Sequence, residues 1–384
     1  MALHFNRDEY ALREARTIEA MRARKLDAML LFAQDSMYWL TGYDTFGFCF
    51  FQCLVLKADG SKALLTRSAD LRQAQRTSII EDIRIWIDRG EASPVLQLKD
   101  LLFEMELLGC RLGIETDTQG LTARNGRLID DNLATFADLV EASDLVPHLR
   151  AIKSPAEIVY VREAARLADL AYEAGIAEIR PGADEGRILA AMQGAIFEGG
   201  GDYPGNEFII GSGPDALLCR YKSGRRKLSE RDQITLEFAG VYRHYHVALM
   251  RTVCVGEPTE RHRDLHEAAL AALKTVEAEM RPGRTFGDVF EAHARVFDER
   301  GLIEHRLNAC GYSLGARFTP SWMDWPMFYK GNAAVIVPNM VLFAHMILMD
   351  SETGTAMCLG RSYLTTDGDP EPLSTAPLDL VARS

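Results

Sequence analysis

Two ionisable side chains stand inside apolar runs of this sequence. Glu237 lies within ITLEFAG and His345 within VLFAHMIL, and both runs have the composition of buried strands. A buried polar group needs a hydrogen-bonding partner, because burial without one costs free energy. A carboxylate and imidazoles that converge in one pocket would satisfy one another and shift each other's pKa values, as acid–base catalysis requires. A histidine in an apolar strand is also commonly a hydrogen-bonded core residue, and this plainer interpretation stays open.

Two further segments offer side chains that suit substrate binding. Arg220 lies in the basic stretch CRYKSGRRKLSERD, where it is either a solvated loop residue or an anchor for a carboxylate. In FTPSWMDWPM, Trp322 and Trp325 stand on either side of Asp324 and close to prolines. We expect this segment to form a loop. Its aromatic rings either pack against the loop itself or form a wall with cation–π contact to a substrate.

The length of the chain predicts two domains, because 384 residues exceed what one hydrophobic core usually organises. Residues 7–24 have helical apolar spacing, and the run LDAMLLFA after them is typical of a buried strand. The segment QCLVLKADGSKALLT has the strand, Asp-Gly turn and strand of a hairpin. A helix-start pattern, SPAE, begins at residue 154. We therefore predict an α/β domain over 1–150 and a second domain over 151–384.

The second domain mixes helices and strands without the regular alternation of a parallel sheet. Its strands adjoin turns rather than each feeding a crossover helix, which predicts an α+β domain with an antiparallel sheet. The expected helices span 158–178, 184–198, 261–279 and 286–299, and the expected strands span 207–211, 233–240, 245–255, 341–348 and 356–365.

Charge and composition argue against several classes of partner. The formal net charge of −12 disfavours nucleic acid and anionic membranes, which favour a basic face. No stretch reaches the ~20 apolar residues of a membrane span, and the first residues lack the apolar core of a signal peptide, so we expect a cytoplasmic location. Seven cysteines without CxxC spacing fit a reduced compartment, and we assign none of them a role.

Five segments follow one another as in the creatinase, aminopeptidase P and prolidase superfamily. They are LRAIKSPAEIVYVREAARLA, QITLEFAGVYRHYHVALMRTVCVG, ACGYSLGARFTPSW, NMVLFAHMILM and AMCLGRSYLTTDG. The sequence resembles that superfamily over essentially its whole length. The resemblance implies a creatinase-type amino-terminal domain, a pita-bread catalytic domain, and a homodimer in which an amino-domain loop reaches the partner's pocket. Phe46 and Phe48, in the run FGFCFF, are candidates for that loop, although such a run is more often core.

The resemblance also bears on metal binding. Metal-dependent members of the superfamily hold two cations with two aspartates, one histidine and two glutamates. The matching positions here are Glu237, Ala248, Tyr312, His345 and Gly360. Three of the five cannot ligate normally, because hard divalent cations in pairs need bridging carboxylates. We therefore expect no metal and no other cofactor, as in creatinase and ectoine hydrolase, which the chain resembles in this respect.

The closer likeness is to ectoine hydrolase. It rests on Glu-Phe-Ala-Gly at 237–240, Arg-His-Tyr-His at 243–246 with Arg-Thr after it, and Gly-Tyr-Ser-Leu-Gly at 311–315 followed by a proline and Trp322. His345 departs from the position expected for that relative's histidine, so the substrate can differ.

Strand alternation, taken with the resemblance, extends the candidate site. It places His246, and less favourably His244, on the same face as position 248. We predict that Glu237, His345 and His246 are catalytic. The substrate-binding candidates are Tyr312, Arg220, His244, Trp322, Asp324, Trp325, Phe46 and Phe48.

Loss of the metal would remove the positive charge that polarises a substrate, and a cationic substrate would replace it. An amidinium or guanidinium group would pair with Glu237 and be electrophilic by itself. The resulting hypothesis is a metal-independent hydrolase of a C–N bond in a small polar compound, either an ectoine-like amidine, a creatine-like guanidine or an amide. Glu237 would act as nucleophile or general base, and an imidazole would protonate the departing nitrogen.

Two alternatives stay open from the sequence. Glu237, His246 and His345 could hold one iron or zinc ion and support peptidase or lyase chemistry. The other alternative is a catalytically inactive pita-bread protein that only binds a partner.

Overall fold

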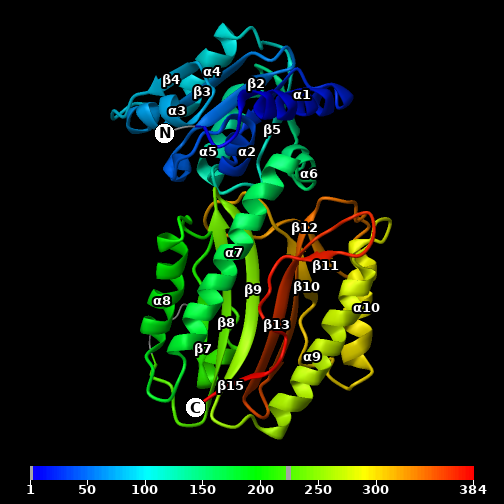
Figure 1. Ribbon diagram of the computed structural model, residues 1–384. Coiled ribbons are helices and arrows are strands. Elements are labelled where there is room, and N and C mark those ends of the chain that lie inside the picture. The colour runs from blue at the N-terminus through cyan, green and yellow to red at the C-terminus, as the bar shows by residue number, and fades with distance from the viewer. Residues whose placement is uncertain (1–2, 222–225) are drawn as a thin grey trace. The chain divides into compact units, whose positions relative to one another are not determined.

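The computed structural model describes residues 3–221 and 226–384. The chain divides into two compact units, Met1–Arg150 and Ala151–Ser384, and each unit is built on its own sheet (Figure 1).

The first unit is an α/β unit. Its elements are α1 (Arg7–Ala23), β1 (Ala28–Leu31), α2 (Gln34–Thr41), β2 (Cys53–Lys57), β3 (Lys62–Arg67), α3 (Leu71–Thr77), β4 (Asp82–Trp86), α4 (Pro94–Glu104), β5 (Arg111–Ile114), α5 (Ala123–Leu133), β6 (Asp138–Glu141) and α6 (Leu145–Arg150), with 3₁₀ helices at Gly47–Cys49 and Ser68–Asp70. The strands form one sheet in the order β4-β3-β2-β1-β5-β6. The predicted hairpin is confirmed, since β2 and β3 are antiparallel.

Side chains of β1 alternate between two cores. Leu30 packs in a cluster with residues of α4 and α5, while Met29 and Leu31 pack in a second cluster with residues of α1, α2 and α6. A strand covered on both faces needs apolar residues at every position, which explains the continuous run LDAMLLFA.

A long helix opens the second unit. Helix α7 (Pro155–Glu178) begins with a capping box, in which the Ser154 side chain accepts the Glu157 backbone N–H at 3.2 Å and the Glu157 carboxylate accepts the Ser154 backbone N–H at 2.8 Å. Pro155 sits in the first turn, where its missing N–H costs nothing. The structure confirms the predicted helix start.

The second unit is α+β, as predicted. Its further elements are α8 (Glu185–Glu198), β7 (Ile209–Ser212), a 3₁₀ helix (Gly213–Leu217), β8 (Asp232–Tyr242), β9 (Tyr245–Val255), α9 (Glu260–Glu279), α10 (Phe286–Asp298), β10 (Ala309–Ser313), β11 (Asp324–Tyr329), β12 (Val341–Asp350), β13 (Thr355–Leu364), β14 (Glu371–Pro372) and β15 (Val381–Arg383). Along the order β11-β10-β12-β13-β9-β8-β7, every neighbouring pair is antiparallel. Strand β14 pairs with β13, and β15 runs parallel to β9.

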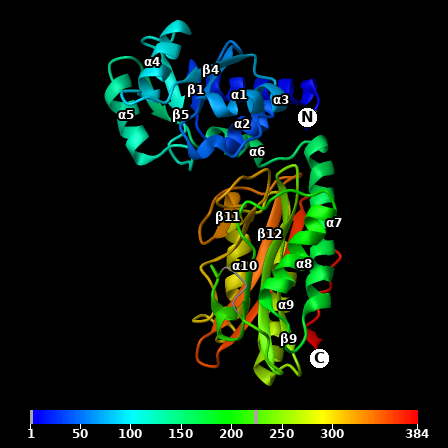
Figure 2. The same cartoon turned by 90° about the vertical axis from the view of Figure 1, so that its left-hand side faces the viewer.

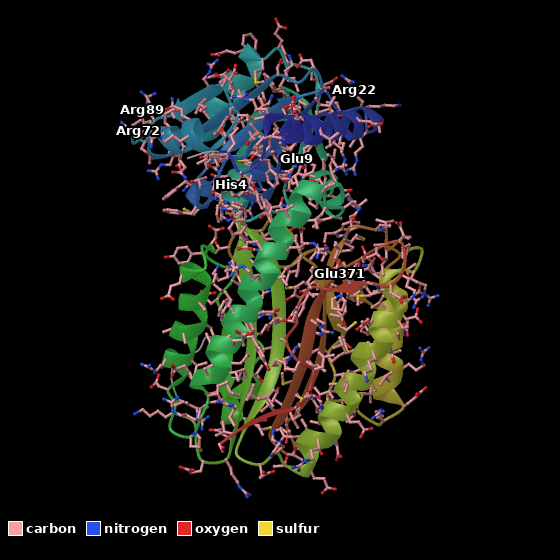
Figure 3. The ribbon with its side chains drawn as sticks, in the orientation of Figure 1. His4, Glu9, Arg22, Arg72, Arg89 and Glu371 are labelled. Carbon is pink, nitrogen blue, oxygen red and sulfur yellow. The ribbon has the colours of Figure 1, made fainter. Side chains whose placement is uncertain are left out.

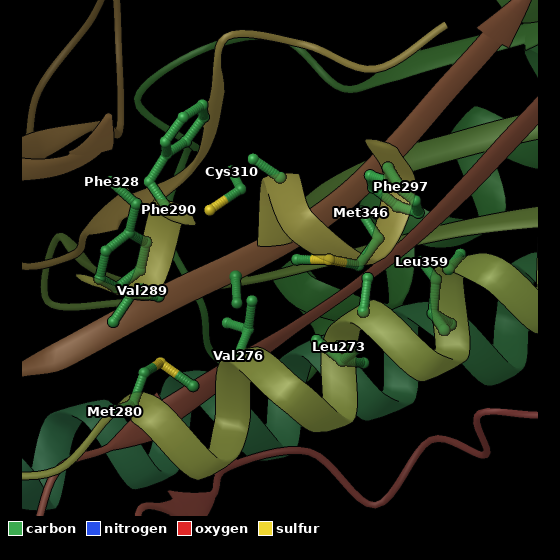
Figure 4. Close-up of a cluster of buried hydrophobic side chains, with 14 of the residues drawn as sticks. Leu273, Val276, Met280, Val289, Phe290, Phe297, Cys310, Phe328, Met346 and Leu359 are labelled. Atoms are coloured by element: carbon green, nitrogen blue, oxygen red, sulfur yellow. The ribbon is translucent and has the colours of Figure 1, made fainter. Parts of the chain in front are cut away.

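Helices of the second unit pack against this sheet. Helix α7 contacts β8 and β9, α9 contacts β12 and β13, and α10 contacts β10 and β11 (Figures 1 and 2). Figure 4 shows the core that results, in which Val276 of α9 and Phe290 of α10 lie with Met346 of β12 and Leu359 of β13. A packed apolar layer thus covers one face of β10, β12 and β13.

The expectation of a loop over FTPSWMDWPM is wrong in its second half. Asp324–Tyr329 forms the strand β11, in which Asp324, Pro326 and Phe328 are buried and the residues between them are more exposed. Pro326 within the strand and Pro320 before it obscure that period of two in the sequence. Strand β11 lies at the edge of the sheet, where a proline is tolerated because its missing N–H breaks no ladder.

Exposed ion pairs lie on the surface of the second unit. Glu371 of β14, labelled in Figure 3, accepts two hydrogen bonds from the Arg162 guanidinium of α7, at 2.6 and 2.8 Å. Such a pair contributes little to stability by itself, since both side chains are solvated. Within the two described ranges, no helix has the length and apolarity that a membrane crossing requires.

Candidate active site

A cavity of about 420 Å³ lies in the second unit. Glu237 of β8, Tyr312 of β10 and His345 of β12 contribute to its wall. These side chains are almost fully buried, with 7 %, 4 % and 8 % of their surface exposed. The structure thus brings together three residues that the sequence analysis selected from separate segments.

Alternation along β12 aims His345 into the cavity. The even-numbered residues 342–348 belong to the core against α9 and α10. The odd-numbered residues, His345 and Ile347 among them, therefore face the other side of the sheet, where both line the cavity. Both faces of this strand are covered, which explains why a histidine stands in an otherwise apolar run.

A β-bulge around Gly311 turns Tyr312 toward the cavity. The pairing of β10 with β11 shifts register on both sides of Tyr312, and Gly311 has a φ of +148°, which residues with a side chain rarely adopt. A Cβ on Gly311 would lie 2.1 Å from the Phe343 carbonyl oxygen. As a result Cys310 packs in the core against the helices, whereas Tyr312, two residues later, lines the cavity.

The Tyr312 hydroxyl links Trp322 to Glu237. The Trp322 indole Nε1–H donates to the Tyr312 hydroxyl at 2.9 Å, and this hydroxyl shares a side-chain hydrogen bond with the Glu237 carboxylate. Because an indole can only donate, the hydroxyl accepts from Trp322 and gives its own hydrogen to the carboxylate. Trp322 also lines the cavity, so the structure places this candidate beside the acid.

Burial raises the pKa of Glu237 to about 7. The positive charge of Arg220 and the hydrogen bond from Tyr312 act in the opposite direction but do not overcome the loss of hydration. Burial, with the nearby Glu237 charge, also lifts the pKa of Tyr312 well above its usual value. A carboxyl group with a pKa near neutrality can take up and release a proton at physiological pH.

His345 is neutral at physiological pH. Burial, reinforced by the charge of Arg220, lowers its pKa to about 4. Its ring centroid lies 5.6 Å from that of Tyr312 and 5.5 Å from that of Phe343. Its Nδ1 atom is buried and has no hydrogen-bond partner within the described part of the chain.

Arg220 and Cys219 also line the cavity. Arg220 is exposed, and its guanidinium donates to the Cys219 carbonyl oxygen at 3.0 Å. Burial, followed by the charge of Glu237, raises the pKa of the Cys219 thiol. The sequence analysis gave Cys219 no role, and the one signal that could have selected it is its position directly before Arg220.

His246 holds two loops together and does not belong to the described lining of the cavity. It is fully buried, its Nε2 accepts the Gly205 backbone N–H at 2.8 Å, and its Nδ1 lies 3.3 Å from the Gly315 carbonyl oxygen. Nδ1 therefore carries the hydrogen. Gly205 leads into residues 206–209, which line the cavity, and the Asn206 side chain accepts the Trp322 backbone N–H at 3.2 Å. These contacts give His246 a positioning role in the wall.

The remaining candidates lie elsewhere in the two units. His244 closes the tight turn between β8 and β9, where its positive φ matches the turn type of a two-residue hairpin, and its ring stacks on Phe318 at 4.1 Å. Asp324 is buried at the start of β11 and Trp325 is partly exposed. None of these candidates lies in the described cavity lining. The roles proposed for all of them stay predictions.

Phe46 and Phe48 belong to the first unit, at its Gly47–Cys49 helix. Phe46 is 81 % exposed, whereas Phe48 is buried. Exposure of a large aromatic side chain is compatible with the loop role that the resemblance implies for Phe46.

Comparison with known proteins identifies the family. The sequence pattern of metallopeptidase family M24 matches residues 159–364, more than half of the chain, and the pattern of the creatinase/prolidase N-terminal domain matches residues 13–152. The chain belongs to metallopeptidase family M24. The superfamily and the amino-terminal domain type predicted from the sequence are thereby confirmed.

Several curated proteins resemble this M24 chain. It is 27% identical over 403 residues to the ectoine hydrolase of Halomonas elongata, an alignment that covers 100% of this chain and 99% of that protein. An uncharacterized hydrolase/peptidase of Sinorhizobium fredii is also 27% identical, with 99% of each protein covered. The Xaa-Pro dipeptidase of Pyrococcus furiosus is 25% identical, over 59% of this chain and 65% of that protein.

Solved structures of the M24 type share the fold. A prolidase from Thermococcus sibiricus superposes with a TM-score of 0.88 at 20% identity, covering 97% of this chain and 99% of the other. A dipeptidase from Mycobacterium ulcerans gives a TM-score of 0.85 at 21% identity, covering 98% and 99%. The predicted pita-bread fold is therefore confirmed.

The metal positions implied by the M24 resemblance do not fit a pair of cations in this chain. Gly360, where the resemblance implies a glutamate, pairs with His345 on one side and Met250 on the other. A Cβ on Gly360 would lie 2.8 Å from the Phe343 ring and 2.9 Å from the Met250 Cβ. Apolar side chains thus fill the space that a carboxylate would need, and Ala248 offers no ligand atom.

A single metal ion is not supported by the donor set either. Within residues 3–221 and 226–384, no three His, Cys, Asp or Glu side chains are placed to hold a metal ion. The trio Glu237, His246 and His345 is not formed, because backbone groups engage both ring nitrogens of His246.

The clamp made by His246 predicts a pH-dependent stability. Burial lowers its pKa to about 3 from the ordinary 6.5, so the unfolded chain takes up a proton at higher pH than the folded chain. Its contribution to stability is complete above the ordinary pKa and is lost as pH falls toward the folded value. In His246→Gln, which cannot titrate, the free energy of unfolding should depend less on pH between about 6.5 and 4.

Urea unfolding of both proteins at several pH values measures this difference. His266→Gln is the matched control, because that imidazole also bonds to a backbone carbonyl, that of Leu378, at 2.8 Å. An unchanged pH dependence in His246→Gln would contradict the role of a buried neutral clamp.

Proposed function

We propose that this chain hydrolyses a C–N bond in a small organic molecule without the help of a metal ion. The observation that carries the proposal is the buried Glu237 carboxylate, whose pKa is raised to about 7 and which lines a cavity together with Tyr312 and His345. The ectoine hydrolase of Halomonas elongata supports it, because that protein's similarity extends over 100% of this chain.

The charge of the substrate would replace that of the metal. An amidinium or guanidinium group pairs well with an ionised carboxylate, and the pair is stronger in a buried site than in water. Binding of a cation would also lower the pKa of Glu237 and keep it ionised. The positive charge of the substrate makes the carbon of the amidinium or guanidinium group electrophilic. In metal-dependent hydrolysis a Lewis acid polarises the substrate in the same way.

Glu237 is the better proton carrier of the site. Its pKa is about 7 in the free site. As the water oxygen attacks and the positive charge of the substrate is lost, Glu237 can accept the proton of that water and then give it to the departing nitrogen as the C–N bond breaks. Burial lowers the pKa of His345 to about 4, so at neutral pH it is not an imidazolium that could act as a general acid. We assign it the orientation of water or substrate through a ring nitrogen, in place of the acid role inferred from the sequence.

Peptidase chemistry is the competing proposal, since the M24 relatives include the Xaa-Pro dipeptidase of Pyrococcus furiosus. The residue at position 360 favours the metal-free route. The Phe343 ring and Met250 occupy the space that a ligating side chain at this position would need.

The role of Glu237 predicts a large loss of turnover on its replacement. Glu237→Gln keeps the shape of the side chain but can neither accept the water proton nor pair with a cation, so kcat should fall by roughly 10²–10⁴-fold. Glu304→Gln, at an exposed site of the same unit, should leave kcat unchanged. Steady-state kinetics with circular dichroism as a check of folding tests this, and a folded Glu237→Gln protein with more than about a tenth of normal turnover would refute the assignment.

The charge of Arg220 predicts the pH profile. Ionised Glu237 is the active form, so kcat/KM should rise with pH through an apparent pKa of about 7. Arg220 holds that pKa down, and Arg220→Gln should therefore move the acid limb to higher pH. Arg231→Gln, at an exposed site outside the cavity lining, is the control. If the acid limb of kcat/KM in Arg220→Gln stays in place or moves to lower pH, Glu237 is not the group that titrates in that limb.

Metal independence is tested by depletion. Extensive dialysis against a chelator should leave activity intact, because the site offers too few ligands. Protein produced without a histidine tag should be assayed alongside its metal content. Activity that rises and falls with the occupancy of one tightly bound transition metal would overturn this part of the proposal.

A further inference from the structure

The described lining of the cavity holds more apolar than polar residues, and its polar residues include buried and exposed ones. Glu237, Tyr312 and His345 form the buried region. Arg220 is exposed and belongs to the same wall. A ligand that touches both regions must be polar at two places, and the positive charge of Arg220 suits a carboxylate at the accessible one.

Apolar side chains from separate elements contribute much of the remaining wall, beside the polar residues Asn206, Glu207, Tyr221 and Ser321. They include Phe208 directly before β7, Ile209 of β7, Leu307 before β10, Met323 directly before β11, Met327 of β11 and Ile347 of β12. Methionine side chains adapt their shape to apolar ligand groups. A compact polar solute would leave this wall in contact with water, whereas an alkyl or aryl group would displace that water at a gain in free energy.

The volume of the cavity points the same way. At about 420 Å³ it falls within the ~300–1,000 Å³ range of sites that enclose drug-sized ligands. The space therefore exceeds what an amidine or guanidine of a few carbon atoms fills.

From the lining and the volume we infer that the substrate is an amphipathic amidine or amide. It bears a carboxylate that meets Arg220, a scissile C–N group that meets Glu237, and an alkyl or aryl substituent that packs on Leu307, Met327 and Ile347. This inference rests on the proposed function, which it narrows from small polar compounds to compounds with a sizeable apolar group.

A series of ligands that differ only in the apolar group tests the inference. N-Acetimidoyl-, N-butanimidoyl- and N-hexanimidoyl-β-alanine carry the same amidinium and carboxylate and alkyl groups of increasing length. Calorimetry with the full-length chain gives their Kd values, and initial rates give kcat/KM. Burial of one methylene strengthens binding by about fourfold, so the hexanimidoyl compound should bind at least about tenfold more tightly than the acetimidoyl compound, even with incomplete burial.

Variants locate the apolar contact. Met327→Gln keeps the length of a partly exposed side chain and should flatten the series, while Met105→Gln, at a partly exposed site of the first unit, should leave it unchanged. Arg220→Gln should weaken all three ligands by a similar factor and preserve their ranking.

The outcomes separate this inference from the proposed function. Equal Kd values along the series, or no binding of any member at millimolar concentration, would overturn the inference, even if the acetimidoyl compound is hydrolysed. A gradient of Kd that Met327→Gln abolishes would support it. If that gradient is present but no member is hydrolysed, the apolar specificity stands and the proposed C–N hydrolysis is in error.

Discussion

The Glu237 carboxylate lies in a strand that is covered on both faces, so water solvates its negative charge poorly. The energetic cost of that charge raises the pKa to about 7, even though Tyr312 donates a hydrogen bond and Arg220 contributes a positive charge. Two neighbouring groups act on this balance. The hydroxyl and the guanidinium make the ionised form attainable, and the apolar surroundings keep it reactive toward a proton or a cation.

At two of the positions that the resemblance assigns to metal ligands, the sheet that carries Glu237 has residues without a ligand atom. Gly360 and Ala248 contribute no ligand, and the Phe343 ring and Met250 fill the space beside Gly360. The Phe343 ring also lies 5.5 Å from the ring centroids of both Tyr312 and His345. Packing of this kind holds the two polar residues in position.

Part of this site could be predicted from the sequence, because local pattern determined it. An acid in ITLEFAG and an imidazole in VLFAHMIL stand out in strands whose other residues are apolar, and the capping box at Ser154 marks the start of the second unit. The antiparallel sheet followed from strands that adjoin turns. The side of the sheet on which Tyr312 lies could not be predicted in this way. The bulge around Gly311 breaks the alternation of side chains from which that side would be inferred.

Residues whose roles depend on long-range contacts could not be assigned from pattern. His246 shares a face with the site along β9, but Gly205, 41 positions away, engages its Nε2. Cys219 reaches the cavity through a loop with no periodic signal, and Pro326 concealed the strand that contains Asp324. In each case tertiary contacts, not local propensity, determine where the side chain lies.

The ionisation of Glu237 is the quantity that tests the account most directly. Isotope-edited infrared spectroscopy of chelator-treated protein, taken as the difference between wild type and Glu237→Gln, reports the protonated carboxyl band of this residue alone. The account predicts that the band is present at acidic pH and disappears with a midpoint near pH 7. A carboxylate that remains ionised down to the ordinary glutamate pKa of about 4.3, or whose signal changes on addition of a divalent metal, would contradict it.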